Sequence, residues 1–132
     1  MNLLDTNACV DILRRRSPRL VRKITDVGVE QIAVSSISAG ELFVGALKSS
    51  DVERNLAAVE LLLSSLVVLS FDPEAAQIYG VVRSRLERAG NKIGHLDTLI
   101  AAHAVAVGAV LVTNNTREFQ RVEGLKIEDW TE

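Results

Sequence analysis

Apolar residues fall into short continuous runs along this chain, and longer stretches with helical periodicity separate the runs. A continuous apolar run, unlike an alternating one, is typical of a strand that is covered on both faces. Strands separated by helices indicate an α/β sandwich around a central, mostly parallel sheet. We expect strands at residues 1–5, 31–36, 66–71, 109–113 and 125–130.

The segments between these runs carry the start and stop signals of helices. Pro18 and Pro73 suit the first position of a helix, where a missing N–H does no harm. Ser36 or Ser38 is available as the N-cap of the helix that follows the second strand. We expect helices over residues 6–16, 18–28, 37–49, 50–65, 73–90 and 94–108, with a short one inside 113–122.

Length and composition predict one compact domain, residues 1–132. The chain is 48% hydrophobic and 24% charged, which argues against disorder, and no apolar run approaches the roughly 20 residues of a membrane span. The N-terminus lacks the pattern of a signal peptide, and the lone Cys9 has no partner for an internal disulfide. We therefore expect a cytoplasmic protein.

Three carboxylates stand in apolar surroundings. Asp5 ends the first strand, and Glu41 and Asp97 lie in helices that are otherwise mostly apolar. Asp5 could cap the next helix, or it could belong to an acidic site. If the acids converge, two carboxylates about 4 Å apart repel by roughly 4 kcal/mol, so a divalent cation or a trapped proton has to compensate. Oxygen ligands suit Mg²⁺ or Mn²⁺.

Other chemistries lack their signatures. The chain contains no G-x-x-x-x-G-K-[ST] loop, no G-x-G-x-x-G and no G-x-S-x-G. His95 and His103 lack the spacing of helical metal ligands, so we expect structural roles for both. Aspartyl-phosphate phosphatases require a second acid two residues after the acid that follows the first strand, and this chain has Asn7 at that position.

Five ordered blocks resemble the PIN-domain toxins of the VapC type, essentially from end to end. These blocks are LLDTN, SSISAGELFVGA, IGHLDTLIAAHA, LVTNNTREF and the closing EDW. The resemblance implies a PIN-like three-layer α/β/α sandwich and a Mg²⁺-dependent endoribonuclease, with Mn²⁺ as a possible substitute. It also implies a prokaryotic toxin that is a homodimer, joins larger toxin–antitoxin assemblies, is inhibited by a VapB-type antitoxin and meets operator DNA only through that antitoxin.

The resemblance also assigns residues. Asp5, Glu41 and Asp97 match the catalytic, metal-binding acids of the family. Many relatives have T-x-D after the fourth strand, where this chain has Thr113-Asn114-Asn115, so Asn115, Glu118 or both would support the site. Further support is expected from Thr6, Asn7 and Thr113.

The implied substrate is RNA, with tRNA favoured and the anticodon loop of initiator tRNA as a candidate. Basic residues concentrate in two segments, 14–23 and 83–92, which are either solvated helix faces or phosphate contacts. The candidate RNA-binding residues are Arg14, Arg15, Arg16, Arg83 and Arg85. The alternatives are a PIN-fold binding module that acts through its antitoxin and operator complex, and a metal-dependent phosphatase.

Overall fold

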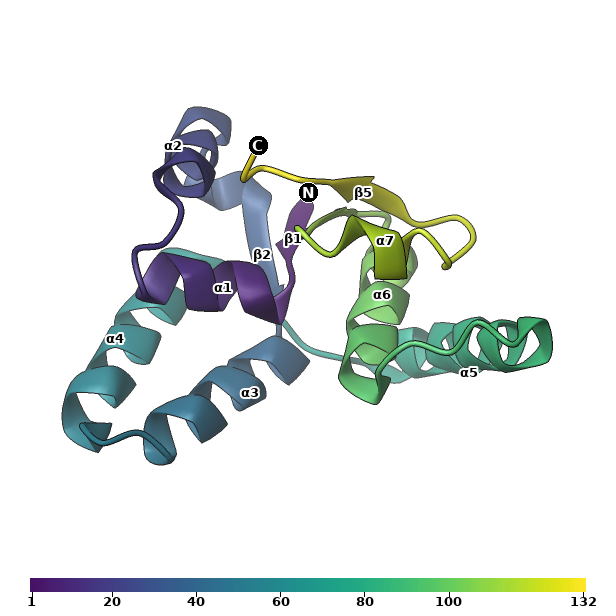
Figure 1. Cartoon of the computed structure of the whole chain (residues 1–132), viewed down its shortest axis with the longest axis horizontal. Helices are drawn as coiled ribbons and strands as arrows, with labels where there is room; N and C mark the ends of the chain where they lie inside the picture. Colours follow the sequence, from purple (N-terminus) through teal and green to yellow (C-terminus); the bar gives the residue numbers. More distant parts are fainter.

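A computed structural model describes all residues, 1–132, as five strands between layers of helices (Figure 1). The strands are β1 (Asn2–Leu4), β2 (Ile32–Ser35), β3 (Val67–Leu69), β4 (Val110–Val112) and β5 (Lys126–Glu128). The helices are α1 (Thr6–Leu13), α2 (Pro18–Val27), α3 (Ser36–Leu47), α4 (Val52–Ser65), α5 (Pro73–Ala89), α6 (His95–Val107) and α7 (Thr116–Phe119), with a 3₁₀ turn, η1 (Val29–Gln31). The strand order is β3-β2-β1-β4-β5 and every pairing is parallel.

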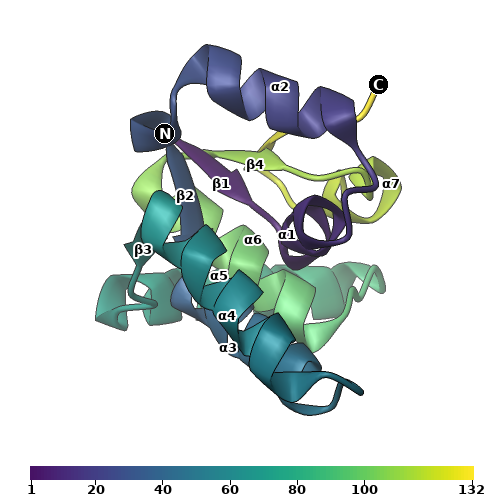
Figure 2. The ribbon, with the colours of Figure 1, turned by 90° about the vertical axis from the view of Figure 1, so that its left-hand side faces the viewer.

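Successive strand residues point to opposite faces of the sheet, and each face has its own helical layer. Leu3 belongs to a buried cluster formed with α5, α6 and α7. The next residue, Leu4, belongs to a second cluster formed with α1, α2, α3 and α4. Figure 1 shows these two sets of helices on opposite sides of the sheet, and Figure 2 shows α2 lying beside β1 and β4. The predicted three-layer sandwich is therefore confirmed, with a sheet that is wholly parallel.

Helix starts follow the capping signals, with one correction. Asp51 and Asp72 cap α4 and α5, each accepting a hydrogen bond from a backbone N–H three residues on. The N-cap of α3 is neither Ser36 nor Ser38 but Ser35, whose Oγ accepts from the N–H of Ile37 at 3.1 Å. None of the helices is both long and apolar enough to cross a membrane.

The helix α1 ends three residues earlier than the sequence predicts. Arg15 adopts a left-handed backbone conformation, with φ of 54°, which is unusual for a residue other than glycine. The N–H of Arg16 then donates to the carbonyl of Asp11 at 2.9 Å, as at many helix C-termini. Arg14, Arg15 and Arg16 therefore lie in an exposed connection to α2 rather than on a helix face.

Candidate active site

Four side chains form a row along the carboxyl edge of the sheet. Leu4 is in register with Val34 on one side and with Val112 on the other, and Val112 is in register with Glu128. The row, in strand order, is Ser35, Asp5, Thr113 and Asp129. The chain builds outward from β1 in both directions, so Asp5 and Thr113 flank the point where the strand order reverses. Open parallel sheets bind their ligands at this point.

Asp5 is a helix cap and a buried acid at once. Its side chain is only 2% exposed, and its Oδ1 accepts from the N–H of Ala8 at 2.8 Å, which caps α1. Burial raises the pKa of Asp5, against hydrogen bonds from Thr113 and Ala8 that favour the charged form. The charges of Asp11 and Asp129 raise this pKa as well. The predicted capping role is thus confirmed, and Asp5 also lies close to other acidic side chains at the carboxyl edge of the sheet.

Asp97 lies in the first turn of α6, half-buried, with Gly94 as an N-cap that offers no side-chain bond. Its pKa is raised from 3.8 to about 6, first by burial, then by the charge of Glu118 and a hydrogen bond to that residue, and last by the charge of Asp5. The positive end of the α6 dipole favours the ionised form, but burial and like charge outweigh it. Asp97 and Glu118, here called the acid pair, are therefore close enough to share a proton.

Glu118 is held in place from two sides. One carboxylate oxygen accepts from the backbone N–H of Gly94 at 3.0 Å, and the other accepts from the side-chain amide of Asn115. The N–H of Asn115 in turn donates to Thr113 Oγ1 at 2.9 Å. Both candidates for the fourth acidic position therefore lie at the site, with Asn115 positioning the carboxylate that faces Asp97.

Glu41 shows no interaction with the other predicted acids. It is half-buried on α3, and its carboxylate makes no hydrogen bond and perturbs neither Asp5 nor Asp97. No three histidine, cysteine or acidic side chains converge in metal-binding geometry. The structure therefore brings Asp5 and Asp97 together, adds Glu118 to them, and leaves the role of Glu41 a prediction.

The supporting residues are divided between the site and the surface. Thr6 Oγ1 donates to Ser38 Oγ at 2.9 Å, which links α1 to the helix that carries Glu41. Asn7 is exposed on α1, in the turn that begins at Asp5. Ser38 is fully buried, and the sequence predicted it only as a possible helix cap. Ser38 lies three residues before Glu41 and therefore on the same face of α3, which was the signal available in the sequence.

Cys9 and His103 are core residues, which for His103 agrees with the predicted structural role. Cys9 is fully buried, and burial raises the pKa of its thiol to about 12. His103 Nδ1 lies 2.8 Å from Ser35 Oγ, and its ring meets that of Phe71 edge to face. Burial lowers the pKa of His103, so the neutral ring joins α6 to the end of β2. His95, by contrast, is exposed at the start of α6.

The donor set suits a hard divalent cation. Every candidate ligand atom is a carboxylate oxygen, and no lysine or arginine forms an ion pair with Asp5, Asp97 or Glu118. Burial first, and the charges of neighbouring carboxylates after it, raise the pKa values of Asp5 and Asp97, so both carboxylates would be stabilised by a proton or by a bound cation. Mg²⁺ and Mn²⁺ bind such oxygen sets while keeping several waters.

Comparisons with known proteins identify the family and agree with the fold. The PIN domain model matches residues 3–125. A tRNA(fMet)-specific endonuclease VapC from Salmonella typhimurium is 44% identical over 97% of this chain and 96% of its own length. A protein of the same description from Shigella flexneri is 43% identical over 98% and 97%. A crystal structure of DNA-bound VapBC from Salmonella typhimurium superposes with a TM-score of 0.94 at 42% identity, covering 98% of this chain and 97% of that one.

Proposed function

The chain belongs to the VapC family of PIN-domain ribonuclease toxins, and on that premise we propose that it is a divalent-metal-dependent endoribonuclease that cuts tRNA and is neutralised by a VapB-type antitoxin. The observation that carries the proposal is the acid pair beside Asp5, at the position where the strand order of the sheet reverses. Two relatives are described as tRNA(fMet)-specific endonucleases, so initiator tRNA is the first substrate to test.

Each residue of the site has a task in this proposal. Asp5 and Asp97 would hold the cation, with Glu41 reaching it from α3 or orienting one of its waters. When bound, Mg²⁺ or Mn²⁺ would polarise the scissile phosphate and lower the pKa of a water. Glu118, fixed by Gly94 and Asn115, keeps the carboxylate of Asp97 oriented and adjusts its affinity for a proton. Thr113 does the same for Asp5.

Cleavage of end-labelled total tRNA tests the proposal directly. The antitoxin-free protein should produce discrete fragments in the presence of Mg²⁺ and none when EDTA replaces it. Turnover of p-nitrophenyl phosphate in the same buffer should be absent, because a phosphatase would act on small phosphomonoesters. Failure to cut tRNA, ribosomal RNA and messenger RNA, with antitoxin binding intact, would favour the binding-module alternative.

An apolar groove gives the proposed antitoxin a place to bind. It has a volume of about 190 Å³ between α1, α3 and α4, and Val10, Leu13, Leu42, Ala46 and Val59 are among its walls. An amphipathic helix can bury its apolar face in such a groove. The DNA-bound VapBC complex from Salmonella supports this partner and its link to operator DNA. The homodimer remains a prediction.

Replacing the exposed Ala58 with Arg should weaken antitoxin binding at least about tenfold, which is about 1.4 kcal/mol, because the long charged side chain would occupy the groove. Titration calorimetry with the antitoxin measures the effect, and RNA cleavage should be unchanged. Ala57→Arg is the matched control, since Ala57 is also exposed on α4 but does not line the groove. Equal affinities for the two variants would place the antitoxin elsewhere.

A further inference from the structure

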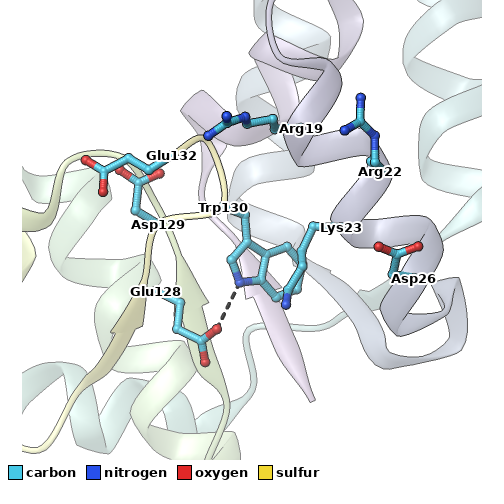
Figure 3. A pocket seen from close by; sticks show the side chains of 8 residues that line it. All are labelled: Arg19, Arg22, Lys23, Asp26, Glu128, Asp129, Trp130 and Glu132. Atoms are coloured by element: carbon cyan, nitrogen blue, oxygen red, sulfur yellow. Dashed lines mark hydrogen bonds between the residues drawn. The ribbon is translucent and has the colours of Figure 1, made fainter.

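The two basic segments of the chain meet very different surroundings in the fold. On α2, three cations line a cleft of about 490 Å³ whose opposite wall is the C-terminal segment (Figure 3). Four carboxylates line the same cleft, so the cleft carries no net positive charge. The cleft's charged residues are Arg19, Arg22, Lys23, Asp26, Glu128, Asp129 and Glu132.

Residues that line the α2 cleft also contact one another. The Nζ of Lys23 lies 5.9 Å from the centre of the Trp130 ring, and Trp130 Nε1 donates to Glu128 Oε1 at 3.0 Å. The indole therefore stands between a cation of α2 and an acid of the C-terminal segment (Figure 3). An approaching phosphate would meet acidic and basic groups together, which is unfavourable for binding an anion.

The second basic segment lines two hollows that share Leu86 as a common wall. Arg83, Lys92 and His95 line one hollow of about 90 Å³, and Arg85 and Arg121 line the other, of about 120 Å³. Only Glu87 and Glu123 oppose these cations, and Glu87 is already paired with Arg83 at 3.5 Å. Arg83, Arg85, Lys92 and Arg121 are here called the basic rim.

The basic rim is attached to the acid pair. The loop of residues 90–94 carries Lys92 at the rim and also Gly94, whose N–H donates to Glu118. The guanidinium of Arg121 donates to the carbonyl of Lys92 at 3.1 Å and holds this loop. His95 and Thr98, on the first turn of α6 with Asp97, line the same hollow as Lys92. The loop that carries Lys92 thus also contacts Glu118, and the hollow that Lys92 lines includes residues from the first turn of α6, where Asp97 lies.

We propose that the RNA substrate crosses the protein over the α5–α7 side, with phosphates next to the scissile one held by Arg83, Arg85 and Lys92, and that the α2 cleft carries no RNA. This inference rests on the proposed nuclease function and names the surface that serves it. A strand entering a cluster of carboxylates needs nearby positive charge, and charges act over a screening length of about 8 Å at physiological salt. The basic rim supplies that charge, because its four cations face only two carboxylates, Glu87 and Glu123.

Two triple variants with identical charge changes test the inference. Arg83→Gln with Arg85→Gln and Lys92→Gln alters the rim, and Arg19→Gln with Arg22→Gln and Lys23→Gln alters the α2 cleft. Each removes two arginines and one lysine from exposed positions. Both are made in an Asp97→Asn background, so that fluorescence anisotropy measures binding of tRNA without cleavage.

The rim variant should lose about ten- to a hundredfold in affinity at low salt, and the slope of log affinity against log salt should fall by about 2, since each lost phosphate contact removes about 0.7 to 0.9. The cleft variant should stay within about twofold. Arg83→Lys with Arg85→Lys, which keeps the charge, should retain the slope, and this separates phosphate contacts from a folding defect.

Equal losses in the two triple variants, or a larger loss in the cleft variant, would overturn the inference. So would an absence of tRNA binding by the parent protein. These outcomes differ from a failure of the proposed function, because the wild type is assayed for cleavage separately. If the wild type cuts RNA but the two triple variants lose equal affinity for tRNA, only the proposed binding surface is refuted. If the wild type cuts no RNA, the proposed nuclease function is refuted.

Discussion

Replacing Asp97 with Asn is expected to lower RNA cleavage by roughly a hundred- to a thousandfold and to leave the fold intact. Asn has nearly the same shape as Asp, but it lacks the negative charge that would hold a divalent cation. Asp97 is half-buried, at the start of α6, and faces Glu118 and Asp5. The measurement is the initial rate of cleavage of end-labelled tRNA in Mg²⁺, with circular dichroism to check the fold.

Asp26→Asn is the matched control, because Asp26 is an exposed acid on α2 that lies outside the carboxyl-edge row. Its cleavage rate should stay within about twofold of wild type. Both variants should bind the antitoxin as the wild type does. Wild-type cleavage by Asp97→Asn would remove Asp97 from the catalytic set and favour a binding role for this fold.

The fold could be predicted because its signals are local. Pro18 and Pro73 stand at the first positions of α2 and α5, and Gly90 follows α5 with a left-handed φ of 70°. The N-cap of α3 could not be predicted, since several serines there can cap equally well. Ser36 Oγ accepts from the N–H of Phe71, and Ser38 Oγ accepts from Thr6, whereas Ser35 stands just before the first residue of α3 and accepts from the N–H of Ile37 while also contacting His103.

The candidate site was only partly visible in the sequence. Asp5 and Asp97 stand out because each is an acid in an apolar stretch. The pairing of Asp97 with Glu118 was not visible, because it depends on how the loop of residues 90–94 packs on α7. Asp129 was missed as an influence on Asp5 because it stands between Glu128 and Trp130 rather than in an apolar stretch, although its position after the last strand places it in the same row.

The distinction between the two basic segments also lay beyond the sequence. Both are rich in arginine, and from the sequence alone both could be solvated helix faces or phosphate contacts. Only the fold places the acidic C-terminal segment against α2 and leaves the end of α5 beside the acid pair. Three of the four carboxylates that share the cleft with Arg19 and Arg22 are more than 100 residues away along the chain, so no local pattern reports them.

The metal-free protein is expected to lose stability as the pH rises from about 4 to about 6. The pKa of Asp97 is about 6 in the folded protein, against 3.8 as the ordinary value, so the folded state keeps a proton that the unfolded state has released. Stability falls with pH wherever the folded state binds more protons. Two pKa units correspond to about 3 kcal/mol, which solvent screening of a half-exposed group reduces to about 1 to 2 kcal/mol. The raised pKa of Asp5 acts in the same direction.

Asp97→Asn should therefore be more stable than the metal-free wild type by about 1 to 2 kcal/mol at pH near 7.5 and close to it at pH near 4. Urea unfolding at the two pH values, in EDTA, measures the difference. Asp26→Asn should follow the wild type at both. A wild-type pH dependence in Asp97→Asn would mean that other groups, not the acid pair, govern stability in this range.

Adding Mg²⁺ should restore much of this lost stability at pH near 7.5 and little of it at pH near 5, because a cation and a proton compete for the same carboxylates. The restoration should disappear in Asp97→Asn, which keeps the fold but not the charge. A metal-dependent site predicts this behaviour, because the burial and like charge that make the ionised carboxylates unfavourable without metal also favour binding of a cation. The same urea series, run with and without Mg²⁺, measures the binding of the cation independently of any RNA.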